Sequence, residues 1–260
     1  MNGYSMKLID LTGKTALVTG GSRGVGRATA QLLTRAGALV GFSYHIRKDE
    51  ADETLRLIEV EGGKGWAHTA DFSTEEEILN LFKRVDKEFP DGLDFFIANA
   101  GIWFSEDIPI ENMTTEQWRK TMAINLDSVY WATREAGKRM RKSGRIVYVG
   151  STAGQRGEAF HADYAASKGA LMSMVKSLCV EFGSRDITVN CVAPGWVDTE
   201  MAAPAYNVPG ARERIEKGIP IKRIAAPEDV AGPIVFLCSH LARHITGEIL
   251  NVNGGSVLCG

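Results

Sequence analysis

The sequence lacks paired cysteines, long apolar runs, an excess of one charge and any Pro/Gly/Ser-rich linker. Its four cysteines, Cys179, Cys191, Cys238 and Cys259, lie far apart without the C-x-x-C spacing of a zinc site. We therefore expect no metal site, and buried thiols in a reducing compartment. The net charge of −2 gives no electrostatic reason to bind nucleic acid, so we expect no polynucleotide partner.

No segment stays apolar for the length of a membrane span, and the first residues have no basic start followed by an apolar core. We therefore expect a cytoplasmic protein without membrane contact. A length of 260 residues fits one large α/β domain or two small ones, and no linker or repeat divides the chain. We predict one domain over residues 1–260. The Ala/Pro/Gly-rich stretch 199–222 is predicted to be a mobile segment over the site, or else a surface excursion.

Apolar, β-branched runs alternate with segments of helical periodicity along the chain. Strands are expected within 15–20, 38–44, 64–71, 93–101, 144–151, 187–195 and 248–255. Helices are expected within 25–37, 48–61, 73–89, 162–184 and 227–240, and from about 115. This alternation predicts an α/β fold, a single Rossmann-type doubly wound domain whose seven-stranded parallel sheet has helices on both faces. Ligands of such sheets bind at the carboxyl ends of the strands.

A glycine-rich stretch, "TGGSRGVG", follows the first expected strand and leads into the first helix. Gly20, Gly24 and Gly26 let the backbone turn tightly and approach a pyrophosphate, which the helix N-terminus also attracts. The spacing G-x-x-x-G-x-G differs from the common dinucleotide fingerprint, so a turn without a ligand is the alternative. Its position between strand and helix favours nucleotide binding.

The residues after the second strand indicate which nicotinamide cofactor is used. Ser43 to Arg47 include no acid that could bind the ribose diol of NAD. Arg23 in the glycine loop and Arg47 could instead face a 2′-phosphate, because a guanidinium matches phosphate geometry. The pattern favours NADPH over NAD. As an alternative, Arg47 simply begins a solvated, charged helix.

Two later strand ends add candidate cofactor contacts. Asp71 follows the third strand, where its carboxylate could accept a hydrogen bond from an adenine amino group. Alternatively it is a turn residue at a helix entry. The small residues of "ANAG" (98–101) follow the fourth strand and leave room for a flat ring, unless they only form a tight strand exit.

Tyr164 and Lys168 lie four residues apart and would share one face of a helix. Tyr44 and Lys48 repeat this spacing, but only Tyr164 has a serine, Ser151, thirteen residues upstream on the preceding strand. A nearby ammonium favours phenolate, so we expect the pKa of Tyr164 to be lowered from about 10. Ser151 could hold a carbonyl oxygen while Tyr164 donates its proton, as hydride arrives from a nicotinamide. A Ser–Lys hydrolase is the rival reading, but "VGSTAGQRG" lacks the G-x-S-x-G elbow.

Jointly and in this order, these motifs resemble the short-chain dehydrogenase/reductase family over nearly the whole chain. The resemblance implies that Tyr164 is the acid/base and that Ser151 orients the carbonyl. Lys168 would tune Tyr164 and hold the nicotinamide ribose, and Asn125 would keep a water in a proton path from Lys168. The resemblance implies these cofactor contacts: Thr19, Gly20, Ser22, Arg23, Gly24, Val25, Gly26, Tyr44, Arg47, Asp71, Phe72, Asn99, Ala100, Gly101, Tyr164, Lys168, Pro194, Gly195, Val197 and Thr199. Ala98 departs from the asparagine of many members.

Within the family, "SRGVGRA", "IPIKRIAAPEDVA" and "ITGEILNVNGG" are most similar to the 3-oxoacyl-(acyl-carrier-protein) reductase group. That similarity implies docking of an acidic carrier protein on Lys142 and Arg185, at the ends of two long helices, and a homotetramer built on those helices. As an alternative, these two residues only cap helix C-termini. Residues expected on the substrate side are Trp103, Phe104, Gln155, Phe160, His161, Trp196 and Met201. His161 is expected to be a wall residue rather than a catalyst.

The predicted function is NADPH-dependent reduction of a carbonyl to a secondary alcohol, with a 3-oxoacyl thioester as the leading substrate. An NAD(P)-dependent sugar, polyol or secondary-alcohol dehydrogenase is the alternative, and the aromatic residues suggest an apolar or ring-bearing carbonyl. A non-catalytic, dinucleotide-sensing regulator would be expected to lose Ser151, Tyr164 or Lys168. All three are present.

Overall fold

The computed structural model describes residues 8–258, in which seven parallel strands form one sheet. The strands are β1 (Thr15–Val18), β2 (Leu39–Tyr44), β3 (Gly65–Thr69), β4 (Leu93–Ala98), β5 (Met140–Val149), β6 (Thr188–Pro194) and β7 (Ile249–Val252). Their order is β3-β2-β1-β4-β5-β6-β7. Successive strands are therefore added on one side of β1 as far as β3, and on its other side from β4 onward. The predicted seven-stranded parallel sheet is confirmed.

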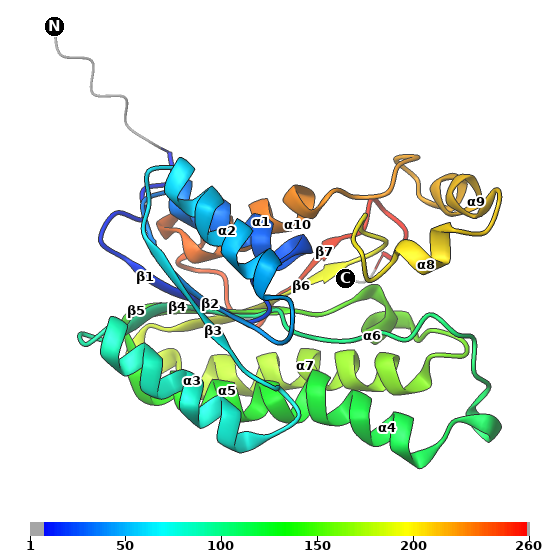
Figure 1. Ribbon diagram of the computed structural model, residues 1–260, viewed down its shortest axis with the longest axis horizontal. Helices are drawn as coiled ribbons and strands as arrows, with labels where there is room; N and C mark the ends of the chain where they lie inside the picture. Colours follow the sequence, from blue (N-terminus) through cyan, green and yellow to red (C-terminus); the bar gives the residue numbers. More distant parts are fainter. Residues whose placement is uncertain (1–7, 259–260) are drawn as a thin grey trace, which may run out of the picture.

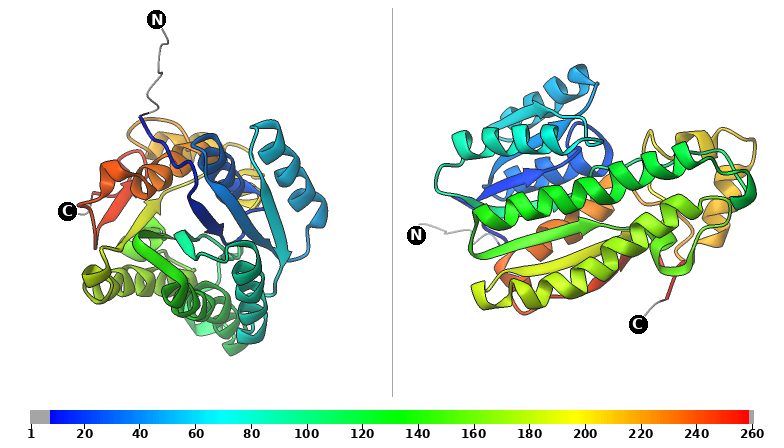
Figure 2. Two further views of the ribbon diagram at one scale, coloured as in Figure 1. Left: turned by 90° about the vertical axis from the view of Figure 1, so that its left-hand side faces the viewer. Right: turned by 90° about the horizontal axis from the view of Figure 1, so that it is seen from below.

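Two layers of helices cover the sheet (Figure 1; Figure 2, left). One layer holds α1 (Gly24–Arg35), α2 (Lys48–Val60) and α10 (Pro227–Cys238). The other holds α3 (Glu75–Glu88), α4 (Thr115–Met122), α5 (Ser128–Arg139) and α7 (Ala162–Glu181). Short elements are η1 (Ile110–Asn112), η2 (Ala123–Asp127), α6 (Thr152–Arg156), η3 (Gly183–Arg185), α8 (Ala203–Tyr206), α9 (Ala211–Gly218) and η4 (His240–Ala242). No helix within residues 8–258 is long and apolar enough to cross a membrane.

Each face of the sheet has its own apolar core, because successive side chains of a strand point to opposite faces. Leu17 and Phe96 pack into the core beneath α3, α5 and α7. Their neighbours Val18 and Ile97 pack into the core beneath α1 and α10. Since both faces are buried, the strands are apolar at nearly every position, which is the pattern that the sequence shows.

The long helix expected from about Thr115 is present but is interrupted. Thr114 caps α4, accepting a hydrogen bond from the Gln117 backbone N–H at 3.1 Å. A π-helical turn, η2, then joins α4 to α5. Such turns displace the side chains that follow and occur often at functional sites. This one contains Asn125.

The segment 199–222 lies between β6 and α10 and contains α8 and α9. It extends past the carboxyl ends of the strands, to the right of the sheet in Figure 1. Its first residues, Thr199 to Ala202, line the pocket described below. That the segment moves and covers a substrate stays a prediction.

Candidate active site

A pocket of about 410 Å³ opens at the carboxyl ends of the strands. The residues that follow β1, β2, β3, β4, β5 and β6 all contribute to its wall. The reversal of strand order between β1 and β4 explains its place, since crossovers leave the sheet in opposite directions there and open a crevice. The motifs that the sequence places after strands thus converge on one site.

The glycine loop after β1 makes one side of this pocket. Gly20 and Gly24 have φ of +67° and +52°, a region that favours glycine. A Cβ on Gly26 would lie 2.1 Å from the Gly20 carbonyl oxygen and 2.6 Å from Asn99 Nδ2, so no side chain fits there. Arg23, the N-cap of α1, gives no side-chain cap to the first N–H groups of the helix. These features fit a bound pyrophosphate, which backbone N–H groups at a helix start would hold.

Thr19 lies beneath the loop and outside the pocket wall, in contrast to the expected cofactor contact. Its hydroxyl oxygen accepts hydrogen bonds from the backbone N–H groups of Asn99 (2.9 Å) and Ala100 (3.0 Å). The Asn99 amide in turn donates to the carbonyl oxygens of Thr19 (2.9 Å) and Gly20 (3.0 Å). Thr19 therefore joins the ends of β1 and β4, because its hydroxyl is fully engaged there.

The other predicted cofactor contacts lie in the pocket wall, and these are Gly20, Ser22, Arg23, Gly24, Val25, Gly26, Tyr44, Arg47, Asp71, Phe72, Asn99, Ala100, Gly101, Tyr164, Lys168, Pro194, Gly195, Val197 and Thr199. Asp71 Oδ1 accepts a hydrogen bond from the Ser73 backbone N–H at 2.9 Å. This bond is the main cause that lowers the pKa of Asp71, so its carboxylate is an acceptor at neutral pH.

Ser151, Tyr164 and Lys168 meet at the pocket wall. Ser151 directly follows β5 and caps α6, its hydroxyl oxygen accepting from the Ala153 backbone N–H at 3.1 Å. Lys168 Nζ donates to the Val149 carbonyl oxygen at 2.9 Å and lies 5.8 Å from the centre of the Tyr164 ring. One turn of α7 and one strand end thus place a hydroxyl, a phenol and an amine together.

The expected lowering of the tyrosine pKa is wrong for this structure. Burial raises the pKa of Tyr164 to about 12, and the hydrogen bond with Ser151 offsets this only in part. Burial also lowers the pKa of Lys168 to about 8. The physical reason is that Lys168 Nζ donates to a backbone carbonyl and lies over the ring rather than at the phenol oxygen. Desolvation therefore outweighs the attraction between ammonium and phenolate.

Asp163 positions the start of α7 and was missed by sequence reasoning. Its Oδ1 accepts from the Tyr164 backbone N–H at 2.8 Å, and its Oδ2 accepts from the Thr121 hydroxyl at 2.6 Å. Gln117 Nε2 donates to the same Oδ2 at 3.3 Å. The carboxylate is buried and ties α4 to the first turn of α7. An acid in the first turn of a helix was the available signal.

Asn125 is fully buried in η2 and lies behind the pocket wall. Its Oδ1 accepts from the Ile102 backbone N–H at 2.8 Å, and its Nδ2 donates to the Ile102 carbonyl oxygen at 2.9 Å and to Ser167 Oγ at 3.2 Å. A Cβ on Gly101 would lie 3.1 Å from Asn125 Oδ1 and 3.4 Å from Lys168 Nζ. Asn125 thus fixes the strand exit beside Lys168, and its role in a proton path stays a prediction.

The substrate side of the pocket is aromatic, but four of the residues predicted there lie outside its wall, and these are Phe104, Gln155, Phe160 and His161. Trp103 and Trp196 line the wall and meet edge to face, with ring centres 6.0 Å apart. His161 is buried behind the wall, where it stacks on Trp103 at 5.0 Å. Gln155 is also outside the wall, because its Nε2 donates to Asn251 Oδ1 at 2.7 Å.

Of the other aromatic and sulfur side chains expected here, Met201 lines the wall, whereas Phe104 and Phe160 do not. Sequence reasoning missed Arg156 and Glu158, which line the pocket on the exit from α6. Burial raises the pKa of Glu158. A charged pair just after the helix that Ser151 caps was the available signal.

Lys142 and Arg185 lie at the edge of the sheet opposite the pocket. Lys142 is near the amino end of β5, and Arg185 ends η3 three residues before β6, whereas Ser151 lies just past the carboxyl end of β5. The Arg185 guanidinium donates to the carbonyl oxygens of Gly137 (2.7 Å) and Met140 (2.5 Å). Its side chain therefore caps the C-terminus of α5, in agreement with the alternative that it is a helix-capping residue.

Comparison with known proteins extends the likeness to whole chains. A family model described as enoyl-(acyl carrier protein) reductase matches residues 20–256. An uncharacterized oxidoreductase of Escherichia coli K12 is 39% identical over 92% of this chain and 98% of that protein. A 3-oxoacyl-[acyl-carrier-protein] reductase of Aquifex aeolicus is 35% identical, over 95% and 98%. An angucycline C-6 ketoreductase with bound NADP, 34% identical, superposes with a TM-score of 0.90 over 96% of this chain and 98% of that one.

Proposed function

The chain belongs to the short-chain dehydrogenase/reductase family, and on this premise we propose that it reduces a ketone to a secondary alcohol with NADPH. The convergence of Ser151, Tyr164 and Lys168 on the pocket that the glycine loop lines is the observation that carries the proposal. A dinucleotide-sensing regulator would not need a phenol and an amine held together at the ligand. A carbonyl reductase does need them.

In the proposed mechanism, the ketone oxygen accepts hydrogen bonds from the Ser151 and Tyr164 hydroxyls. A nicotinamide held by the glycine-loop side of the pocket would supply the hydride. Tyr164 gives its proton to the oxygen as the carbon is reduced, so an alcohol forms and the tyrosine is left as phenolate. The raised pKa of about 12 keeps Tyr164 protonated at neutral pH, which is the state that a proton donor needs. With a pKa of about 8, Lys168 is mainly an ammonium at neutral pH. Its charge, over the ring, stabilises the phenolate until a proton returns from solvent.

NADPH is proposed over NADH for two reasons. Two guanidinium groups border the side of the pocket that would hold the adenosine, and no acidic residue stands at the end of β2. Arg23 lies in the glycine loop and Arg47 follows β2, and both line the wall. A guanidinium binds a phosphate through parallel hydrogen bonds, which a ribose hydroxyl cannot match. The NADP bound to the similar angucycline ketoreductase supports the same choice.

Two substrate classes have support. A 3-oxoacyl thioester is the leading one, because relatives with that activity in their names match over nearly the whole chain. A ring-bearing, apolar ketone is the second, because Trp103 and Trp196 offer aromatic surface on the wall. Neither Lys142 nor Arg185 borders the pocket, so carrier-protein docking draws no support from this single chain. Assembly into a homotetramer stays part of the proposal.

The test is a substrate panel with NADPH and NADH as reductants. Acetoacetyl thioesters, diketones, cyclic and polycyclic ketones and ketoses would be compared by the rate of cofactor oxidation. We expect ketone-dependent oxidation of NADPH, with higher kcat/KM than with NADH. Activity on ketoses alone would replace both substrate classes with a sugar dehydrogenase. Equal efficiency with NADH would contradict the proposed cofactor preference.

A further inference from the structure

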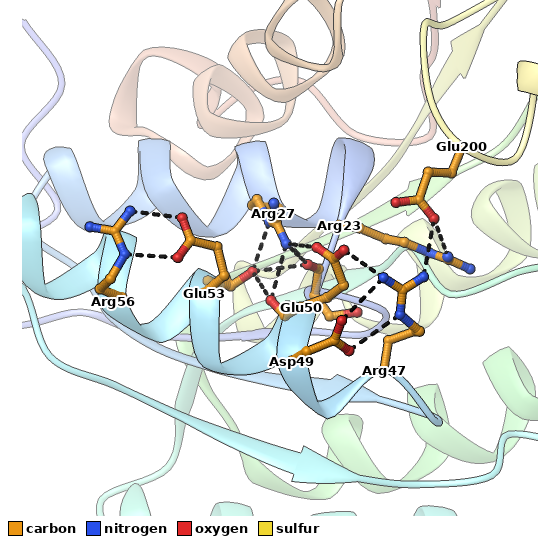
Figure 3. A network of polar contacts seen from close by, with 10 residues as sticks. Arg23, Arg27, Arg47, Asp49, Glu50, Glu53, Arg56 and Glu200 are labelled. Carbon is orange, nitrogen blue, oxygen red and sulfur yellow. Dashed lines mark hydrogen bonds and ion pairs between the residues drawn. The ribbon is translucent and has the colours of Figure 1, made fainter.

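Glu200 places a carboxylate beside Arg23 and Arg47, although no acidic residue stands at the end of β2. It lies in the loop after β6, next to Thr199, and lines the same pocket as the arginines. Glu200 Oε2 is 2.6 Å from Arg23 Nη1 and 3.6 Å from Arg47 Nη1, so one carboxylate bridges both guanidinium groups (Figure 3). These are the two side chains assigned to the 2′-phosphate.

The surrounding charges explain why Glu200 matters. Arg47 also contacts Glu50 at 2.7 Å and Asp49 at 3.2 Å, and Glu50 is shared with Arg27 (Figure 3). Three guanidinium groups thus face three carboxylates, so these six side chains together carry no net charge. They are Arg23, Arg27, Arg47, Asp49, Glu50 and Glu200. A dianionic phosphate gains little from a neutral group. One carboxylate has to leave before the arginines can attract it.

Glu200 is the carboxylate that can leave most easily. Asp49 and Glu50 are in the first turn of α2, where the helix dipole stabilises acids. Glu50 is additionally held by Arg27 and has only 21% of its side chain exposed. Glu200 is on a loop with 53% exposed, and within residues 8–258 no other ion pair of its side chain is present. Exposed ion pairs of this kind are weak, so a phosphate displaces this one at little cost.

We infer that Glu200 competes with the 2′-phosphate of NADPH for Arg23 and Arg47, and thereby sets how strongly this protein prefers NADPH to NADH. The inference rests on the cofactor assignment of the proposed function. NADH has no 2′-phosphate, so it binds with the Glu200 ion pairs intact. NADPH binds by exchange, in which Glu200 moves into solvent.

The experiment measures dissociation constants, not turnover. Binding of NADPH, NADH and adenosine 2′,5′-bisphosphate would be measured by fluorescence and calorimetry for the wild type and Glu200→Gln. Loss of the competing carboxylate is expected to tighten NADPH and the bisphosphate about threefold to tenfold. NADH is expected to change by less than about twofold.

Asp198→Asn is the matched control. Asp198 is two residues away with 50% of its side chain exposed, and it pairs with Arg212 at 2.8 Å rather than with Arg23 or Arg47. The Asp198→Asn substitution removes the same charge from the same loop. It should leave all three dissociation constants within about twofold of their wild-type values. Equal tightening by both variants would overturn the inference, because a general charge effect would then suffice. Unchanged or weaker NADPH binding by Glu200→Gln would also overturn it, showing that Glu200 supports the arginines.

The inference and the proposed function fail separately. If no ketone is reduced, but Glu200→Gln still tightens the bisphosphate, the proposed function falls and the role of Glu200 stands. If NADPH-dependent reduction is found, but Glu200→Gln binds NADPH as the wild type does, the role of Glu200 falls alone.

Discussion

Lys168 is a buried side chain that serves the proposed site and lowers the stability of the folded protein. The residue is 4% exposed, and its Nζ donates a hydrogen bond to the Val149 carbonyl oxygen. Desolvation by burial lowers its pKa to about 8. The ammonium form is therefore disfavoured in the folded protein, and holding it beside Tyr164 at neutral pH destabilises the fold.

This gives a pH dependence with a definite sign. Between about pH 8 and the ordinary lysine value of 10.5, the unfolded chain holds a proton on Lys168 that the folded chain has lost. Stability therefore rises with pH in this window. From pH 8 to pH 10, the free energy of unfolding of the wild type should gain about 2 kcal/mol relative to Lys168→Met. Urea unfolding at several pH values measures it, and parallel pH profiles for the two proteins would contradict the lowered pKa.

Chemistry and spacing together predicted that Ser151, Tyr164 and Lys168 would meet, and all three line one pocket. Their catalytic roles stay a prediction. Predictions failed where a side chain has a closer partner that lies far away in the sequence. Thr19 bonds to the end of β4, and His161 stacks on Trp103, so neither reaches the pocket. Glu200 could not be paired with Arg23 from the sequence, since 177 residues separate them.

Strand ends and helix starts do most of the positioning in this molecule. The glycine loop reaches the pocket because β1 ends and α1 begins within a few residues, with Gly26 packed on the Gly20 carbonyl. In α10, by contrast, Gly232 has open space where a Cβ would be. A methyl group would therefore clash with backbone at Gly26 but would meet open space at Gly232.

Gly26→Ala should destabilise the protein by about 1–3 kcal/mol, because its Cβ overlaps backbone that cannot move aside cheaply. It should also weaken cofactor binding, since the loop must open. Gly232→Ala should leave cofactor binding unchanged and stabilise α10 by up to about 1 kcal/mol. Urea unfolding and NADPH titration of both variants check this. A Gly26→Ala protein as stable as the wild type would show that the loop is not tightly packed.

The elements themselves were largely predictable, because strands buried on both faces and amphipathic helices have different periodicities. Six of the seven strands fall within the expected ranges, and β5 begins four residues earlier than expected, at Met140. The π-helical turn η2 was not predicted, since its residues continue the helical pattern of α4 and α5. Its effect is visible only in space, where Asn125 bonds to the strand exit at Ile102.

Across the whole molecule, one pocket collects contributions from six strand ends and from segment 199–222. Parallel strands bring their carboxyl ends to the same edge, so motifs spread over the sequence meet there. The location of the site followed from this rule alone. The substrate did not, because the aromatic wall depends on how Trp103 and Trp196 meet across two distant loops.

In the proposed reaction, Tyr164 gives the proton that turns a bound ketone into an alcohol. The most direct test compares Tyr164→Phe with the wild type, using the best ketone of the panel and NADPH. Removing the hydroxyl should lower kcat at least about 100-fold, since general acid catalysis contributes about 10²–10⁴. The NADPH dissociation constant should stay within about twofold, because the ring remains in place. Substantial turnover by Tyr164→Phe, with NADPH bound normally, would contradict the account.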